Sequence, residues 1–557
     1  MAVVGSALWA AAGDALGWIT ELGDEETVYY RTGKRSVEGT VEWKRRIGGR
    51  FGPTVTLPAG TYSDDTQLRL SVSRAIRGTG EFDAEAFAKV ELPVWLSYSL
   101  GGGRGTTAAA ANLAKSSVTW FSNFFSSRDS RGYFTAGGNG AAMRVQPHVW
   151  KSKTLHFGEF AGDVLKDAII THGHPIGFCG AVFHALSLAY ALENRELPSA
   201  NKWKEFVDEL RNLPKIVKED EQLSLFWLKP WEERFGDTFQ SAVAIEADRT
   251  VSLISQVQPI LNGGAKEYRS LLNALGAFEE ATRGSGTNTA IAAACLASFG
   301  RDITPEKVML LGANAIGSDT DTISSMAGAI LGAVCRSEPK WKLQDRNYLA
   351  SEAERLAGIA SGAQSASFPY PDLMSWSPPS TQGDAVGLRD NSLWLAGLGR
   401  AEALGNVWGT SEADWQWLKL EFGQTVLAKR RSKPRTLSTD DLPVDRSHAR
   451  SVDDRRGTRE PSLFTQEPLQ RSGGPMARSE VPVSKAGSNR TTPINTGQAV
   501  RSIDDLTDWV IEENFKPDVV GRAFLLAAQG PHAVDRSIAL AAVVAKAVDA
   551  RRRKAGK

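Results

Sequence analysis

The segment Gly317-Ser318-Asp319-Thr320-Asp321-Thr322 runs directly into the apolar stretch Ile323 to Val334. Apolar residues recur in that stretch at the spacing of an α-helix. The same spacing is found in segments 66–77, 160–170, 176–192 and 288–299. Glycine-rich punctuation separates these segments, and convincing alternating strands are scarce. The pattern predicts an all-α, bundle-like fold over residues 1–340, with functional loops at the ends of helices.

A second cluster of acids and hydroxyls, Tyr62-Ser63-Asp64-Asp65-Thr66, precedes the helical segment that begins at Gln67. Each cluster has the composition of a helix N-cap, where Ser, Asp and Thr satisfy free backbone N–H groups. Capping needs only one such residue for each helix, however, and adjacent carboxylates repel unless a cation joins them. All-oxygen donors suit Mg²⁺, Mn²⁺ or Ca²⁺ better than zinc. From the residues alone, capping and metal binding both stay open.

Composition restricts the class of protein. A chain of 557 residues is long enough for roughly two to four folding units. The hydrophobic fraction of 42% and the formal net charge of +1 are typical of a globular protein without a global attraction to nucleic acid or membrane. The three cysteines lie far apart, which argues against a structural zinc or a disulfide framework. We expect a cytoplasmic protein, because Asp14 interrupts the first apolar run and no stretch has the length of a membrane helix.

The chain beyond residue 340 changes character twice. Residues 341–428 contain many tryptophans and are predicted to form a helical extension packed on the first domain. Residues 429–500 are dominated by Arg, Ser, Thr, Pro and Asp, so a disordered linker is predicted. Residues 501–557 recover helical periodicity and end in the basic tail Arg551 to Lys554, which predicts a small helical module.

Five segments of residues 1–340 resemble, in this order, motifs of the ADP-ribosylglycohydrolase family, which includes the dinitrogenase reductase-activating glycohydrolases and the ADP-ribosyl-acceptor hydrolases. They are Gly13 to Gly17 with Glu21, Tyr62 to Thr66, Gly138 to Arg144, Thr171 to Pro175, and Gly317 to Thr322. The resemblance implies an all-α fold with two Mg²⁺ or Mn²⁺ ions in a cleft where ADP-ribose is released. The chain also carries extra sequence at about 24–60 and 195–270.

The resemblance also implies roles for individual residues. Metal ligands are expected in two groups: Ser63, Asp64 and Asp65, then Asp319, Asp321 and Thr322. Glu21 matches a carboxylate that touches a metal or the scissile ribose, and Glu21, Asp64 and Asp65 are the expected catalytic residues. The expected substrate-binding residues are Asn139, Gly140, Met143, His172, Gly317 and Ser318. Most members have glycine where this chain has Ser318, which adds a hydroxyl at a position of close approach to the ligand.

The predicted function is a metal-dependent hydrolase that cleaves the glycosidic bond between ADP-ribose and a modified acceptor, most simply a protein side chain. Two alternatives stay open. One is a catalytically inactive ADP-ribose-binding protein, although the intact acids argue against it. The other is a hydrolase of ADP-ribosylated nucleic acid or of a free nucleotide derivative. No membrane partner is expected, and nucleic acid binding through the basic linker or tail is less favoured than solvated charge.

Other candidates carry weaker signals. The segment Gly101 to Thr107 is glycine-rich but lacks the Gly-Lys-Ser/Thr ending of a P-loop, although its amides could still receive a phosphate. Phe51 and Tyr133 could stack on adenine, with core packing as the alternative. His174 and Asp14 are expected to be structural.

Overall fold

The computed structural model describes residues 1–49, 52–126, 132–409, 413–444, 502–529 and 533–555. The chain divides into two compact units, Met1–His448 and Ala449–Lys557. The predicted disordered linker falls largely on residues 445–501, which lie outside the described residues.

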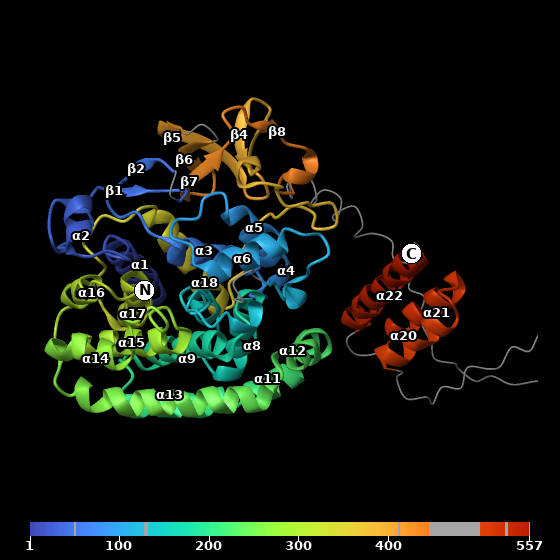
Figure 1. Cartoon of the computed structure of the whole chain (residues 1–557), viewed down its shortest axis with the longest axis horizontal. Coiled ribbons are helices and arrows are strands. Elements are labelled where there is room, and N and C mark those ends of the chain that lie inside the picture. The colour runs from blue at the N-terminus through green and yellow to red at the C-terminus, as the bar shows by residue number, and fades with distance from the viewer. Residues whose placement is uncertain (50–51, 127–131, 410–412, 445–501, 530–532, 556–557) are drawn as a thin grey trace, which may run out of the picture. The chain divides into compact units, whose positions relative to one another are not determined.

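Helices dominate the first unit (Figure 1), and the predicted all-α fold is confirmed for its main part. The helices are α1 (Ala2–Gly17), α2 (Glu25–Thr32), α3 (Asp64–Ala75), α4 (Ala84–Ala86), α5 (Leu92–Trp95), α6 (Arg104–Leu113), α7 (Gln146–Trp150), α8 (Phe157–Thr171), α9 (Pro175–Asn194), α10 (Ala200–Leu210), α11 (Leu213–Glu219), α12 (Lys229–Phe235), α13 (Phe239–Leu261), α14 (Tyr268–Ala274), α15 (Gly286–Ser298), α16 (Pro305–Ala313), α17 (Thr320–Val334) and α18 (Arg346–Ala360). A two-stranded antiparallel hairpin, β1 (Trp43–Arg46) and β2 (Thr54–Leu57), interrupts the helices.

Helices α1 and α17 lie antiparallel with their backbones in direct contact. A Cβ atom on Gly13 would lie 2.2 Å from the Ser324 carbonyl oxygen, and one on Gly17 would lie 2.3 Å from that of Thr320. Only glycine permits this approach. The contact brings the C-terminal end of α1, and with it Glu21, beside the acidic N-terminal end of α17.

Helix α9 is long and apolar enough to cross a membrane by composition. In this fold it is a core helix, since 89% of its apolar window is buried. It packs against α8, α15 and α17. Its apolar character therefore follows from burial inside the protein.

The predicted helical extension over residues 341–428 is wrong beyond α18. Six strands form one sheet in the order β7-β6-β5-β4-β3-β8, antiparallel except for β3 and β8. They are β3 (Val386–Arg389), β4 (Ser392–Leu395), β5 (Gly399–Gly409), β6 (Asp414–Leu420), β7 (Thr425–Arg430) and β8 (Arg435–Thr436). Asp390 and Asn391 both adopt left-handed backbone with φ of 49° and 59°, as a two-residue hairpin turn between β3 and β4 requires.

Aromatic cross-strand pairs explain why this segment is β structure. Trp408 on β5 is the register partner of Trp415 on β6, and Leu404 is the partner of Trp417. Such pairs stabilise sheets, and the two-residue spacing of Trp415 and Trp417 is that of a strand. Four tryptophans of this segment therefore lie on strands: Trp394, Trp408, Trp415 and Trp417.

The predicted start of the linker at 429 is also too early. Residues 429 and 430 belong to β7, and Arg431 and Arg435 bind Asp384 and Asp441 through their guanidinium groups. The ordered first unit is therefore described to residue 444.

In the parts of the second unit that the structure describes, residues 502–529 and 533–555, the chain forms three helices, as the periodicity of residues 501–557 suggests. They are α20 (Ile503–Glu512), α21 (Pro517–Ala527) and α22 (Ala533–Ala555). Leu506, Val510, Val519, Ala523 and Leu540 form its small core.

Candidate active site

A cavity of about 780 Å³ opens at the junction of several segments that lie far apart in the sequence. Glu21, Asp64, Asp65, Asp319, Asp321 and Thr322 line one part of it. Gly101 to Thr107, Gly137 to Gly140, Met143 and His172 line another part, together with Glu280, Arg283 and Gly284. The cavity therefore has an acidic part and a glycine-rich part.

The two acidic clusters meet at the acidic part. The Thr322 hydroxyl donates to Oδ1 of Asp65 over 3.2 Å. Oδ2 of Asp65 is buried and has no hydrogen-bond partner among the described residues. The glycine-rich part begins directly beside these acids, since the Asn139 side chain donates to Oδ2 of Asp319 over 2.8 Å.

The N-terminal end of α3 is capped mainly by Asp14, a residue outside the acidic cluster 63–66. Its Oδ1 accepts from the backbone N–H of Ser63, and its Oδ2 accepts from the backbone N–H and the hydroxyl of Thr66, over 2.5 to 2.9 Å. Ser63 caps the same helix by accepting from the N–H of Asp65 at 3.3 Å. Because Asp14 and Ser63 already accept from these N–H groups, the carboxylates of Asp64 and Asp65 are not needed for capping. Both line the cavity.

Burial and mutual repulsion act together on these acids. Burial raises the pKa of Asp64 well above its ordinary value, and the nearby Glu21, Asp14 and Asp319 raise it further. Burial also raises the pKa of Asp65 and Asp321, and neighbouring carboxylates again add to the effect. Buried carboxylates of this density call for a cation or for protons.

The donor set fits a hard divalent cation in its chemistry. It offers several carboxylates and a threonine hydroxyl, together with an unpartnered buried oxygen on Asp65. Among the described residues, no group of three or more Asp, Glu, His or Cys side chains lies close enough together to coordinate one metal ion as they stand. The fit therefore rests on the oxygen donors and on the orphaned oxygen.

Glu21 lies in the turn after α1 and is held by an arginine. Arg45 of β1 donates to Oε2 of Glu21 over 3.0 Å, and its guanidinium lies over the rings of Trp18 and Trp43 at 5.0 and 5.9 Å. Burial raises the pKa of the Glu21 carboxyl, and Arg45 offsets part of that rise. The ion pair favours the charged form of Glu21.

His172 lies at the glycine-rich part and is held by its neighbours. Arg144 donates to the Thr171 hydroxyl over 2.9 Å, and that hydroxyl forms a hydrogen bond with Nδ1 of His172 over 2.7 Å. Burial lowers the pKa of His172 to about 3, so the imidazole is neutral near pH 7.

Comparison with known proteins agrees with this arrangement. A profile of the ADP-ribosylglycohydrolase family matches residues 2–365. This chain belongs to the ADP-ribosylglycohydrolase family. It is therefore a hydrolase of the glycosidase class that acts on ADP-ribosylated substrates.

Individual relatives of this ADP-ribosylglycohydrolase are distant. ADP-ribosylhydrolase ARH3 of Xenopus tropicalis is 25% identical over 308 residues, which cover 52% of this chain and 79% of the relative. ADP-ribosylhydrolase ARH3 of Danio rerio is 28% identical over 291 residues, covering 49% and 69%. A solved ADP-ribosylglycohydrolase-related protein complex covers 64% of this chain and 98% of its own, with 20% identity and a TM-score of 0.39.

Most residues predicted for the glycohydrolase site line the one cavity, but three do not. Ser63 is buried behind Asp65 as a helix cap. The Ser318 hydroxyl donates to the Ala315 carbonyl over 2.8 Å, so it turns into a local loop. Gly317 lies beside Phe278 with φ of 96°.

The weaker candidates separate in the same way. His174 caps α9 by accepting from the N–H of Ile176. The Tyr133 hydroxyl donates to the Ile169 carbonyl and accepts from Trp227, so its ring belongs to the core. The segment Gly101 to Thr107 does line the cavity. Phe51 lies outside the described residues.

Sequence reasoning missed three charged residues. Arg45 holds Glu21, and Glu280 and Arg283 line the cavity. Arg45 lies in the extra sequence at 24–60, where no family motif points to it. Its place in the basic run Lys44-Arg45-Arg46 was the available signal.

Proposed function

We propose that the cavity is a metal-dependent active site that releases ADP-ribose from a modified protein side chain. The observation that carries this proposal is the meeting of Glu21, the 64–65 pair and the 319–321 pair at one part of a single cavity. Because these acids come from three separate segments, neither capping nor local sequence explains their convergence.

The two parts of the cavity suit the two ends of ADP-ribose. The start of α6 has no side-chain cap, so its N–H groups, together with the loop Gly101 to Gly103, suit the diphosphate. The neutral imidazole of His172 lies in the same wall. The ribose that carries the scissile bond then lies among the carboxylates.

Hydrolysis joins the oxygen of a water molecule to C1 of this ribose as the bond from C1 to the acceptor breaks. The acceptor atom leaves with the electron pair and gains a proton, and the water loses one. When bound, two divalent cations would polarise the ribose and lower the pKa of water. Asp64, Asp65, Asp319, Asp321 and Thr322 would hold them.

Glu21 is placed to act on the reacting centre. Its carboxylate either accepts the proton of water or stabilises the positive charge that develops on the sugar. Both roles need the ionised form, which the contact with Arg45 favours.

The test is release of ADP-ribose from substrates linked through arginine, serine or nucleic acid, each with and without Mg²⁺ or Mn²⁺. Release from a protein linkage that stops with chelator and returns with metal supports the proposal. Tight binding of ADP-ribose without release from any acceptor would make the protein a binder. Faster release from the nucleic acid linkage would mean that the natural acceptor is a nucleic acid and not a protein side chain.

A further inference from the structure

The extra sequence at 24–60 forms a structure that reaches the catalytic carboxylate. Arg31 of α2 donates to the backbone carbonyls of Ile19 and Glu21 over 2.8 and 3.0 Å. Arg45 of β1 donates to the Glu21 side chain over 3.0 Å and to the Trp18 carbonyl over 3.3 Å. The insertion therefore packs directly on the turn that presents Glu21 to the cavity.

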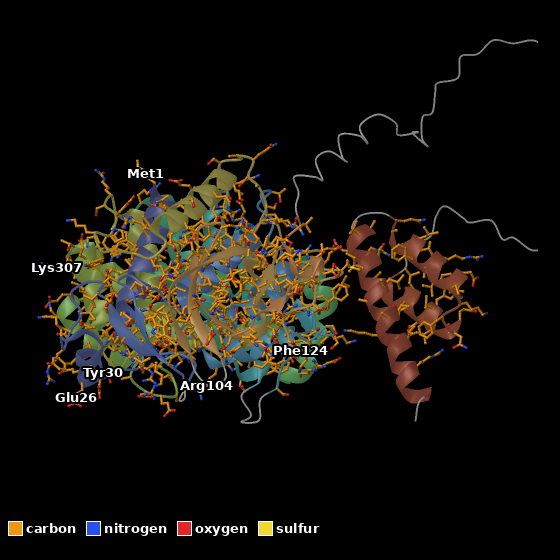
Figure 2. All side chains as sticks on the ribbon, turned by 90° about the horizontal axis from the view of Figure 1, so that it is seen from above. Met1, Glu26, Tyr30, Arg104, Phe124 and Lys307 are labelled. Carbon is orange, nitrogen blue, oxygen red and sulfur yellow. The ribbon has the colours of Figure 1, made fainter. Side chains whose placement is uncertain are left out.

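The same insertion has a pocket of about 300 Å³, distinct from the ADP-ribose cavity. Its walls include Tyr30, Arg31, Lys44, Arg45 and Arg46. Tyr30 is 75% exposed and lies at the edge of the unit (Figure 2), so the pocket is reached from solvent. Lys44 is exposed, and among the described residues it has no ion-pair partner.

Positive charge dominates the lining of this pocket, which among the described residues includes four cationic residues and no acidic one. Behind the lining, Glu21 and Asp24 act on Arg31, and Glu21 also pairs with Arg45. Burial and the nearby Arg45 lower the pKa of Arg31 to about 10, which shows that like charges are held close together. An anion seated among them would relieve this repulsion.

The pocket lies close to the place where the acceptor of ADP-ribose is expected. Arg45 lines the pocket and holds Glu21, which lines the acidic part of the cavity. In the proposed binding mode ADP-ribose extends from that part toward the glycine-rich loops, which leaves the opposite side of the scissile bond for its acceptor. The Glu21 side, where the pocket lies, is the side available to the acceptor.

We propose that this pocket is an acceptor subsite for a carboxylate or phosphate group on a polypeptide, next in space to the ADP-ribosylated side chain. The inference rests on the proposed function. A polypeptide fits better than a nucleic acid backbone, because the neighbouring cations Lys34 and Arg35 are already paired with Glu38 and Glu25. A nucleic acid backbone would need a row of unpaired cations along its phosphates. A single anion-binding pocket suits one acidic side chain.

The experiment compares ADP-ribosylated peptides that share the linkage the enzyme turns over and differ only beside the modified residue, with aspartate, phosphoserine, asparagine or lysine there. The wild-type enzyme is expected to show kcat/KM about tenfold higher for the aspartate or phosphoserine peptide than for the asparagine peptide. Lys44→Gln should reduce this ratio severalfold. The matched control Lys34→Gln, also exposed but outside the pocket, should retain it.

A small ADP-ribose derivative without a peptide separates this inference from the proposed function. Lys44→Gln should turn it over at the wild-type rate, whereas no turnover by the wild type would mean that the proposed function itself fails. Equal kcat/KM for the four peptides would overturn the subsite, as would an acidic preference that survives in Lys44→Gln. A preference for an oligonucleotide-linked substrate that Lys44→Gln removes would also overturn it, in favour of a nucleic acid acceptor.

Discussion

The hydroxyl of Thr322 donates to Oδ1 of Asp65 over 3.2 Å, and this bond joins two residues that are 257 positions apart in the chain. It places the N-terminal ends of α3 and α17 side by side, with an acidic pair on each. Carboxylates so arranged repel each other unless a cation or a proton intervenes.

Asp321→Asn removes one of these charges at nearly constant volume. We expect turnover to fall by roughly 100-fold or more, because a metal ligand is lost. The unfolding temperature in chelator should stay the same or rise, since the pKa of Asp321 is raised by burial and by Glu21, Asp319 and Asp65. Calorimetric Mn²⁺ titration and thermal melts measure both effects. The exposed Asp302→Asn is the control, and an unchanged Mn²⁺ affinity in Asp321→Asn would remove Asp321 from the metal site.

Glu21→Gln distinguishes a base or charge stabiliser from a ligand. If Glu21 acts on water or on the sugar, turnover should fall by roughly two orders of magnitude while Mn²⁺ affinity largely persists. If it is a ligand, both should fall together. Single-turnover assays beside the same Mn²⁺ titration give the answer, and full activity of the variant would exclude both roles.

Arg45→Gln tests whether the insertion positions the catalytic carboxylate. Without the guanidinium, burial favours the neutral form of Glu21, so kcat should fall by about 10- to 100-fold with a small change in KM. Arg45→Lys keeps the charge and should recover part of the loss. Equal kcat in both variants and the wild type would show that Glu21 is held by other contacts.

Acid should destabilise the first unit through its buried histidines. Burial and Arg69 lower the pKa of His184 to about 3 from an ordinary 6.5, so the unfolded chain takes up a proton as pH falls through 6.5 while the folded chain does not. This contribution to stability is present above pH 6.5 and is lost toward pH 3, at up to about 1.4 kcal/mol per pH unit. The acids with raised pKa act with the opposite sign, so a variant is needed to isolate it.

His184→Gln should flatten the pH dependence of the unfolding free energy between pH 6 and 4. His184 lies 3.0 Å from the Gln146 amide, a contact that glutamine can still reach. Urea unfolding at several pH values measures the slope. His156→Gln, on the exposed side of the fold, should leave the slope unchanged, and an identical slope in His184→Gln would contradict the assignment.

Truncation tests the corrected boundary. A chain ending at residue 444 should retain activity on a small substrate, because the sheet and the cavity are complete. A chain ending at 428 loses the end of β7, including the N–H of Lys429 that donates to the Ser97 carbonyl over 2.7 Å, and the Arg431–Asp384 ion pair. We expect its unfolding temperature to fall by several degrees. Equal stability of both chains would restore the boundary at 428.

The sequence by itself determined the helical class and located the two acidic clusters. Helical spacing in a segment such as 323–334 is local, and the acidic clusters before Gln67 and Ile323 can be recognised without knowing where either lies in space. On the residues alone, capping and metal binding both stayed open for these clusters, and it was the resemblance to the family that implied cations. The resemblance also placed Ser63 and Ser318 in the expected site, whereas in the structure Ser63 caps α3 and the Ser318 hydroxyl closes a turn.

Only the tertiary structure decided which residues share the cavity and what surrounds it. The sheet at 386–436 depends on pairs such as Trp408 with Trp415, and the hold of Arg45 on Glu21 joins a hairpin to a helix end. Strand stability comes mainly from partners across the sheet and not from intrinsic preference. The alternation of Trp415 and Trp417 was the local sign of a strand, and the cross-strand partners that decide it became visible only in the fold. Contacts between separate segments depend on how the backbone packs, and the close approach of α1 and α17 through Gly13 and Gly17 is what places Glu21 beside Asp319 and Asp321.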